Sequence, residues 1–232
     1  MSRLIDFHSH ILPGADHGSG GIRTSLKQIS MMDDAGVDTV VATPHFYPHV
    51  INVEGFLDLV NSTAEELRKN LRESRVKICL GAEVLYCDGL ESMEDLEKLC
   101  FRGTNILLLE LPMEDQWNDN LFYCVKSLSK KYALVLAHID RYIRPHRNDI
   151  AELLDLGAYA QINAPSLSSM GTRRKLMPFL ESDRVVALGS DLHGVDEKSY
   201  KQFLASQKRL GEGFHLIMER SVALLDGAEY LK

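Results

Sequence analysis

The segment DFHSHILPGADHGSGG, residues 6–21, places three histidines and two aspartates around a glycine-rich turn. Imidazoles and carboxylates are side chains that bind transition metals and transfer protons. His8 and His10 are two positions apart, so in a strand they point to the same face, where two imidazoles can hold one ion. The pattern His-x-His is weak by itself, and its meaning depends on partners elsewhere in the chain.

Partners of this kind accompany short apolar runs along the sequence. One run ends in ATPH and another leads into GSDLH, and carboxylates occur in the runs between them. Taken singly, each such residue is more often a hydrogen-bonded structural residue than a ligand. Gathered in one place without cations, they would bury several mutually repelling groups, and metal ions remove that cost. The candidates are His45, Glu83, Glu110, His138, Asp191 and His193, with Gln161 and Asn163 in a further run.

Seven apolar runs rich in β-branched and aliphatic residues are the elements that must position these candidates. They are LIDFHSH, TVVATPH, VKICLGAEV, NILLLEL, ALVLAH, AYAQINA and RVVALGSD. Nearly all lack a polar face, which is typical of parallel strands covered on both sides. In parallel α/β folds the carboxyl ends of the strands converge on one face, so residues that are distant in sequence can meet there.

Segments of helical spacing separate the runs, so the order β/α repeats about seven times. Leu26, Ile29, Met32 and Ala35 follow helical spacing before Gly36, which is placed to cap the helix. The repeat fits either a closed barrel or an open doubly wound sheet, and periodicity alone does not choose between them. Further helices are predicted over Phe56–Leu71, Leu121–Lys130, Ile150–Leu156 and Lys175–Leu180, and one or two over 200–225.

Length and composition limit the class of protein. The chain has 232 residues, 45% hydrophobic and 25% charged, which suits one large domain. Its net charge is −7, and no long basic run offers a track for nucleic acid. No stretch approaches the roughly 20 apolar residues of a membrane span, and the start lacks the apolar core of a signal peptide. Because the four cysteines show no CxxC spacing, we expect reduced thiols in a cytoplasmic protein.

Rival chemistries lack their motifs. None of the four cysteines has an arginine six positions later, as the Cys-x5-Arg signature of thiolate-based tyrosine phosphatases requires. The chain also has no GxxxxGK[ST] phosphate loop and no GxSxG serine nucleophile. Metal chemistry is the route that the residues leave open.

The motifs DFHSHILPGADHG, ATPH, GAEV, LLLELP, AHIDRY, QINAPSL and GSDLHG together resemble the polymerase and histidinol phosphatase (PHP) superfamily. More closely, they resemble the manganese-dependent protein-tyrosine phosphatases encoded with bacterial capsule and exopolysaccharide genes. The resemblance covers roughly residues 4–194 and is specific, because several motifs occur in the family's order. It implies a distorted (β/α)7 TIM-like barrel, a single PHP domain over residues 1–232, and a cluster of two or three metal ions.

The resemblance also implies a ligand set. It makes His8, His10 and Asp191 the ligands of one ion, and Glu83 the carboxylate that bridges two ions. Glu110 and His138 complete the second site. His45 and His193 belong to a third site.

The third site departs from the family's pattern. Its remaining ligand is usually the aspartate before the glycine of DDG, but this chain reads Asp16-His17-Gly18. Imidazole is a competent ligand for manganese, iron or zinc, so His17 can replace the aspartate. Two alternatives stay open: Asp16 swings in as the ligand, or the third site is weakened.

The donor set indicates the chemistry. Imidazoles and carboxylates without thiolate suit Mn²⁺, with Fe²⁺ or Zn²⁺ as alternatives. Two ions about 3.5–4 Å apart activate a shared water as hydroxide and hold phosphoryl oxygens for in-line displacement. The resemblance makes Arg141 the phosphate-binding arginine, whose planar fork suits bidentate contact. The family's Arg-Pro-Pro stretch is missing; Lys198 takes its place as a point charge or is a solvated residue at a helix start. Asp140 is the candidate general acid.

These features predict a metal-dependent phosphatase, and the resemblance implies that it acts on protein phosphotyrosine, with a bacterial tyrosine kinase that controls capsule or exopolysaccharide synthesis as the expected substrate. A phenolate, with a pKa of about 10, leaves more easily than an alkoxide. Phe46, Tyr47, Tyr86 and Trp117 are candidates to wall the phosphotyrosine ring, against the simpler alternative of ordinary packing. Two other functions stay open: a small-molecule phosphatase of the histidinol-phosphate type, and a metal-binding regulatory module without turnover.

Overall fold

Strands and helices alternate along the chain in this computed structural model, which describes residues 3–71, 74–114 and 116–231. The strands are β1 (Ile5–His10), β2 (Thr39–Ala42), β3 (His45–Phe46), β4 (Lys77–Leu80), β5 (Glu83–Leu85), β6 (Ile106–Glu110), β7 (Ala133–Leu136), β8 (Tyr159–Asn163), β9 (Val185–Gly189) and β10 (Leu192–His193). The helices are α1 (Ile22–Asp34), α2 (Val53–Asn70), α3 (Asp119–Leu128), α4 (Arg147–Asp155), α5 (Met170–Leu180), α6 (Glu197–Leu210) and α7 (Glu212–Leu224). Short 3₁₀ helices are η1 (Leu90–Ser92), η2 (Leu96–Leu99), η3 (Ile139–Arg141) and η4 (Ala164–Ser168).

Hydrogen bonds join the strands into two parallel sheets, with the orders β10-β1-β2-β4 and β3-β5-β6-β7-β8-β9. Two of the seven predicted runs each form two strands, β2 with β3 and β4 with β5, so the prediction of one continuous strand in each is wrong. Pro44 lies at the first break, because it has no N–H for a ladder bond. Gly81 lies at the second, where a Cβ would be 2.3 Å from the ring of Phe101.

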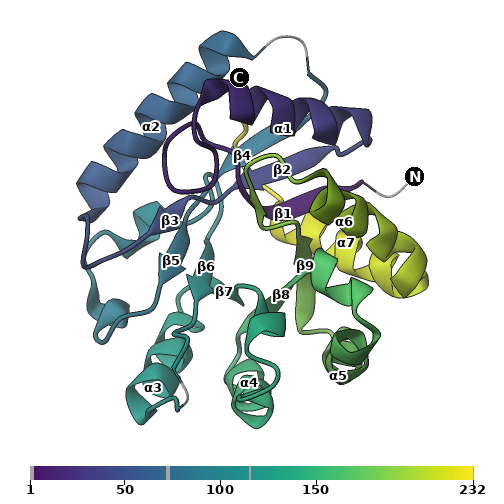
Figure 1. The fold of residues 1–232 in the computed structure, drawn as a ribbon. Helices are drawn as coiled ribbons and strands as arrows, with labels where there is room; N and C mark the ends of the chain where they lie inside the picture. Colours follow the sequence, from purple (N-terminus) through teal and green to yellow (C-terminus); the bar gives the residue numbers. More distant parts are fainter. Residues whose placement is uncertain (1–2, 72–73, 115, 232) are drawn as a thin grey trace.

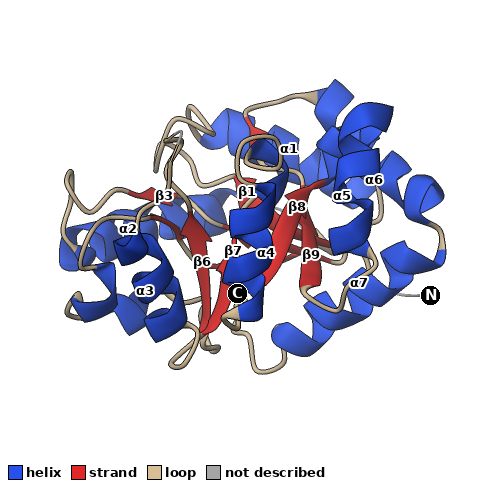
Figure 2. Ribbon diagram, turned by 90° about the horizontal axis from the view of Figure 1, so that it is seen from below, coloured by secondary structure: helices blue, strands red, loops and turns tan. Residues whose placement is uncertain are grey.

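The strands follow one another around a common axis, and the helices lie outside them (Figure 1). β1 lies against β9, which brings the first and last runs of the predicted series together. Figure 2 shows the same arrangement from below, with strands flanked by helices. The strands form the core, and all five residues of β6 are buried, as expected for strands covered on both faces. None of the described helices is long and apolar enough to cross a membrane.

Local capping explains where the helices differ from the predicted ranges. α2 begins three residues early because the Asn52 side chain accepts a hydrogen bond from the Gly55 N–H (2.9 Å). α5 begins five residues early, with Ser169 as its cap. The last predicted helical segment forms two helices, separated at Gly211, whose φ of 55° lies in the left-handed region.

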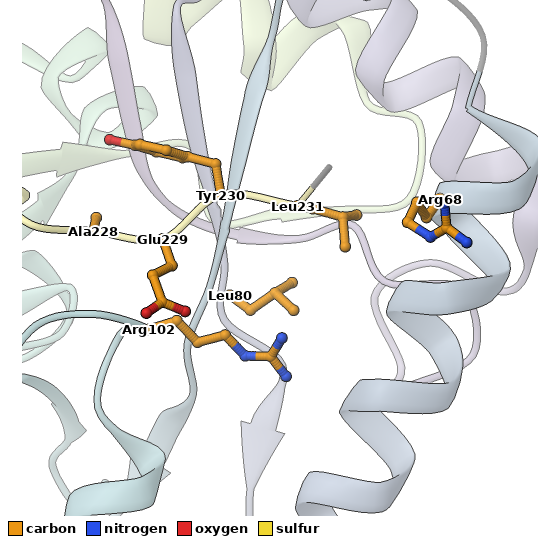
Figure 3. Close-up of a pocket in the computed structure, with 7 residues that line it drawn as sticks. All are labelled: Arg68, Leu80, Arg102, Ala228, Glu229, Tyr230 and Leu231. Atoms are coloured by element: carbon orange, nitrogen blue, oxygen red, sulfur yellow. The ribbon is translucent and has the colours of Figure 1, made fainter.

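The C-terminal segment packs beside β4. The Leu231 N–H donates to the Ile78 carbonyl (2.8 Å), and the Glu229 N–H donates to the Arg102 carbonyl (2.9 Å). Figure 3 shows a cavity of about 630 Å³ between this segment and α2. The residues that line it are Arg68, Leu80, Arg102, Ala228, Glu229, Tyr230 and Leu231. None of them is a predicted site residue, so this cavity is separate from the predicted site.

Candidate metal centre

Side chains at the carboxyl ends of the strands converge on a group that we call the ligand cluster. β1 contributes two imidazoles, and both are at most 1% exposed. All the predicted ligands outside the Asp-His-Gly motif join them through side-chain contacts. The ligand cluster consists of His8, His10, His45, Glu83, Glu110, His138, Asp191 and His193.

Ligand atoms of His8, His10 and Asp191 lie within 4.8 Å of one another, and a Glu83 oxygen lies beside the two imidazoles. The His8 Nε2 lies 3.2 Å from the His10 Nε2 and 3.2 Å from the Glu83 Oε2. The His10 Nε2 is 3.4 Å from the same Glu83 oxygen and 3.3 Å from the Asp191 Oδ1. Four ligand atoms about 2.1 Å from a shared tetrahedral ion would be about 3.4 Å apart. The observed spacings therefore fit one metal ion.

Hydrogen bonds at the outer ring nitrogens determine the state of the inner ones. The His10 Nδ1 donates to the Asp16 Oδ2 (2.6 Å), and the His8 Nδ1 donates to the Gln161 Oε1 (3.1 Å). This Gln161 oxygen also accepts the His138 backbone N–H (2.7 Å), which identifies it as the acceptor end of the amide. With Nδ1 protonated, each Nε2 faces carboxylate oxygens and binds a cation there, either a proton or a metal ion in its place.

Glu83 connects this first group to a second one. Its Oε2 lies 3.0 Å from the His45 Nδ1, and the Glu110 Oε2 lies 3.6 Å from the same nitrogen. The other Glu83 oxygen lies 2.7 Å from the His138 Nε2, which is 3.6 Å from the Glu110 Oε1. The Glu83 Oε2 and the His45 Nδ1 are buried without a hydrogen-bond partner among the described residues. An unpaired carboxylate oxygen between two sets of imidazoles fits a bridging ligand.

The imidazoles of His10, His45 and His193 form a third group, with ligand atoms within 4.8 Å of one another. His17 is exposed, and its ring stacks on His45 (4.7 Å between centroids, 11° between planes) and on His193 (4.6 Å, 27°). His17 therefore lies beside the third group, and its role as a ligand there stays a prediction.

Asp16, the alternative ligand of the third site, is engaged elsewhere. One of its oxygens accepts from the His10 Nδ1 (2.6 Å) and from the His45 backbone N–H (3.1 Å). The other accepts from the Gly18 N–H (2.8 Å). Three donors on one carboxylate favour a residue that positions the imidazoles over one that binds an ion itself.

The carboxylates of the ligand cluster favour positive charge among its imidazoles. Burial alone would lower the pKa of His8, but Glu83 and Asp191 outweigh it, so the pKa is raised. The same balance of burial against carboxylate neighbours raises the pKa of His10 well above its usual value. Burial would raise the pKa of Glu83, but the imidazoles hold it well below its usual range. Burial lowers the pKa of His193 to about 4, which keeps this imidazole neutral and able to coordinate.

Arg141 lies on the exposed side of the ligand cluster. Its guanidinium donates to the Asp191 Oδ2 (2.5 Å) and lies 3.7 Å from the Glu110 Oε1, with 38% of the side chain exposed. A guanidinium has five N–H donors, so donors remain for an oxyanion that approaches from solvent. The predicted phosphate-binding residue is therefore placed beside the predicted metal ligands.

The predicted general acid Asp140 and the predicted phosphate-binding residue Lys198 make contacts that differ from those of Arg141. The Asp140 Oδ1 accepts the Asn163 backbone N–H (2.8 Å), and burial raises the pKa of this carboxyl group. Lys198 is exposed in the first turn of α6. Within the described ranges, no hydrogen bond or ion pair joins its amine to the ligand cluster.

Two amides of β8, to which the sequence motifs assign no role, support the ligand cluster. The Asn163 Nδ2 donates to the Asp191 Oδ2 (2.7 Å), and the Gln161 Nε2 donates to the Asn163 Oδ1 (3.0 Å). Together with the bond from His8 to Gln161, this chain orients one imidazole and one carboxylate of the first group. The i, i+2 spacing that singled out His8 and His10 is also the signal that places these amides on the same face.

Fold and site together define a class: a TIM-like α/β barrel with a candidate metal centre at the carboxyl ends of its strands. The chain belongs to the capsular polysaccharide synthesis family CpsB/CapC, whose model matches residues 4–212. It is 30% identical over 212 residues to the tyrosine-protein phosphatase CpsB of Streptococcus pneumoniae, covering 84% of this chain and 85% of the relative. It is 26% identical over 235 residues to the tyrosine-protein phosphatase YwqE of Bacillus subtilis (strain 168), covering 96% and 91%. The predicted family is confirmed.

Solved structures confirm the predicted PHP-type barrel. One, from crystal structures of YwqE from Bacillus subtilis and CpsB from Streptococcus pneumoniae described as unique metal-dependent tyrosine phosphatases, matches with a TM-score of 0.79 and 24% identity. It covers 97% of this chain and 96% of that one. The histidinol phosphate phosphatase HisK of Lactococcus lactis, complexed with zinc, L-histidinol and phosphate, matches with a TM-score of 0.57 and 14% identity, covering 90% and 94%.

Proposed function

We propose that this chain is a metal-dependent phosphatase that hydrolyses phosphotyrosine in a protein substrate. The observation that carries the proposal is the grouping of His8, His10 and Asp191, with Glu83 beside the two imidazoles, next to Arg141. It combines a place for metal cations with a guanidinium for the phosphoryl group. Membership of the CpsB/CapC family and the tyrosine phosphatases among its relatives support the same activity.

The ligand cluster would hold two or three divalent ions, which we propose to be Mn²⁺, with Fe²⁺ or Zn²⁺ as alternatives. Imidazole and carboxylate donors without thiolate fit these metals. When bound, such ions supply an activated water and Lewis-acid contacts to the phosphoryl oxygens. The proposed ligands are His8, His10, Glu83 and Asp191 for the first ion, Glu83, Glu110 and His138 for the second, and His45 and His193 for a third.

Residues of the chain would bind the phosphoryl group, orient the metal-binding imidazoles and protonate the leaving group. Arg141 binds the non-bridging oxygens of the phosphoryl group with the donors that Asp191 leaves available. Asp16 and Gln161 keep the protons of the two β1 imidazoles on Nδ1. Asp140, whose pKa is raised by burial, is the proposed proton donor to the leaving phenolate.

The cysteines offer no competing nucleophile. Burial raises the pKa of Cys79, Cys100 and Cys124 to about 12, and it also raises the pKa of Cys87. At neutral pH these side chains are therefore thiols, and the thiolate is the nucleophilic form.

For the substrate we propose a bacterial tyrosine kinase that controls capsule or exopolysaccharide synthesis, dephosphorylated in the cytoplasm. The family's description as capsular polysaccharide synthesis supports the setting. The kinase and the compartment rest on the resemblance of the sequence motifs.

Parallel assays of phosphate release from a phosphotyrosine peptide and from histidinol phosphate test the function, first with Mn²⁺ and then with a chelator. We expect chelator-sensitive release that is faster from the peptide. His10→Ala removes an imidazole of two groups and should lower kcat/KM at least about 100-fold. His215→Ala, at an exposed histidine of α7 outside the ligand cluster, is the control and should leave the rate unchanged.

Faster release from histidinol phosphate would instead make the chain a small-molecule phosphatase. No release from either substrate, with Mn²⁺ bound, would contradict the proposal and indicate a regulatory module without turnover.

A further inference from the structure

Four aromatic residues near the strand ends are candidates to contact a substrate ring, and three of them are engaged in the fold. Phe46 is 1% exposed and packs edge-on against Phe56 at 5.2 Å. The Trp117 ring stacks on His146 at 3.9 Å, and its N–H donates to a backbone carbonyl. The Tyr86 hydroxyl donates to an Asp88 carboxylate oxygen (2.8 Å). Tyr47 is therefore the remaining candidate to contact a substrate ring.

Tyr47 directly follows β3, on the side that meets the ligand cluster. It is two positions after His45, so both side chains point to the same side while Phe46 points into the core. The rings of Tyr47 and His45 are nearly parallel, at 15° and 5.1 Å between centroids. The side chain is half-buried, and its hydroxyl makes no hydrogen bond within residues 3–71, 74–114 and 116–231. The ring therefore lies against a proposed ligand and is partly exposed, with the exposed His49 ring 6.0 Å away between centroids.

The charges around Tyr47 are those of the reaction site. A tyrosine hydroxyl has a pKa of about 10, so the residue is a neutral phenol at working pH and adds no charge that would repel a phosphate. Arg141 lies 3.7 Å from the Glu110 Oε1, and the His45 ring on which Tyr47 stacks lies 3.6 Å from the Glu110 Oε2. The apolar surface and the cationic surface therefore border the same carboxylate.

We propose that Tyr47 determines specificity for aryl phosphates: the exposed part of its ring packs against the aromatic ring of the substrate while the phosphoryl group lies at Arg141 and the ligand cluster. This inference rests on the proposed phosphatase function and extends it, since it names the residue that recognises the leaving group. An offset-stacked pair of rings corresponds to about two- to tenfold in affinity. An alkyl phosphate has no ring and loses nothing when Tyr47 is removed.

Binding of two phosphonates to the Mn²⁺-loaded protein tests the inference without turnover. Phenylphosphonate presents the ring and methylphosphonate does not, and neither is hydrolysed, so leaving-group chemistry does not enter. Calorimetric Kd values should show tighter binding of phenylphosphonate to the wild type. Tyr47→Ala should weaken phenylphosphonate about two- to tenfold and leave methylphosphonate unchanged, whereas Tyr47→Phe keeps the ring and the affinity. Tyr86→Ala is the matched control and should change neither Kd.

Other outcomes overturn the inference. Equal weakening of both phosphonates by Tyr47→Ala would mean that the ring only supports His45, and bound metal measured in the same samples would fall with it. No preference of the wild type for phenylphosphonate, or loss of the preference in Tyr47→Phe, would also overturn it. Failure of the proposed function is distinguishable, because it would appear as absent phosphate release even where phenylphosphonate binds selectively.

Discussion

At the scale of single residues, the ligand cluster depends on atoms that touch no ion themselves. Asp16 accepts the ring proton of His10 and the backbone N–H groups of Gly18 and His45. Burial would raise the pKa of Asp16, but these hydrogen bonds hold it far below its usual range. The carboxylate therefore stays ionised across the working pH range and keeps the His10 proton on Nδ1. Metal binding by His10 therefore depends on the position of Asp16 as well as on the imidazole of His10.

Gly18→Ala should weaken metal binding without removing any proposed ligand. A Cβ at Gly18 would lie 2.1 Å from the Cβ of His10 and 2.9 Å from the Asp16 Oδ1, so both must move. Displaced supporting groups cost about 10- to 100-fold in metal affinity, and we expect that loss in a calorimetric titration with Mn²⁺. Gly20→Ala is the control, because nothing lies within 4 Å of a Cβ there. Equal affinities of the two variants would show that Asp16 and His10 tolerate the displacement.

At the scale of elements, the C-terminal segment is held to the barrel by close backbone approaches. The Glu229 N–H donates to the Arg102 carbonyl in the turn that precedes β6. In the same turn, Gly103 has a φ of 77°, and a Cβ there would lie 2.3 Å from the Gly227 carbonyl oxygen. A side chain at Gly103 would therefore push the segment away from β4.

Gly103→Ala should destabilise the fold more than Gly36→Ala. Both glycines have a φ of 77°, so the left-handed strain of about 1–2 kcal/mol is common to the two variants. Nothing lies within 4 Å of a Cβ added at Gly36, whereas a Cβ at Gly103 meets backbone, which adds about 1–3 kcal/mol of overpacking. Urea unfolding measures the difference. Equal free energies of unfolding would show that the C-terminal segment moves aside without a loss of stability.

At the scale of the whole molecule, the features that could be predicted from sequence are those with local causes. The spacing of His8 and His10 and the apolar runs before the other ligands depend on strand geometry alone. The break at Gly81 could not be predicted, because it comes from Phe101 packing twenty residues later. The role of Gln161 likewise depends on the distant backbone of His138, and no local pattern contains that contact.

Metal binding should reverse the pH dependence of stability of the whole protein. The pKa values of His8 and His10 in the folded chain are raised above 6.5, burial being outweighed by carboxylates. Their contribution to stability is therefore full below the unfolded value of about 6.5 and is lost as the pH rises through the folded values. We expect the Tm of the chelator-treated protein to fall as the pH rises above about 6.5.

The increase in Tm that Mn²⁺ produces should grow as the pH rises. The ions displace protons from the same nitrogens, so they bind more tightly at higher pH. At 100 times Kd, binding adds about 2.7 kcal/mol, or about 5–10 °C in Tm for a chain of this size. Scanning calorimetry with and without Mn²⁺ at each pH measures the increment, and His215→Ala should leave it unchanged. An increment that stays constant or shrinks with rising pH would mean that the ions do not bind where the protons of His8 and His10 are lost, and the ligand cluster would then be an ion-pair network rather than a metal site.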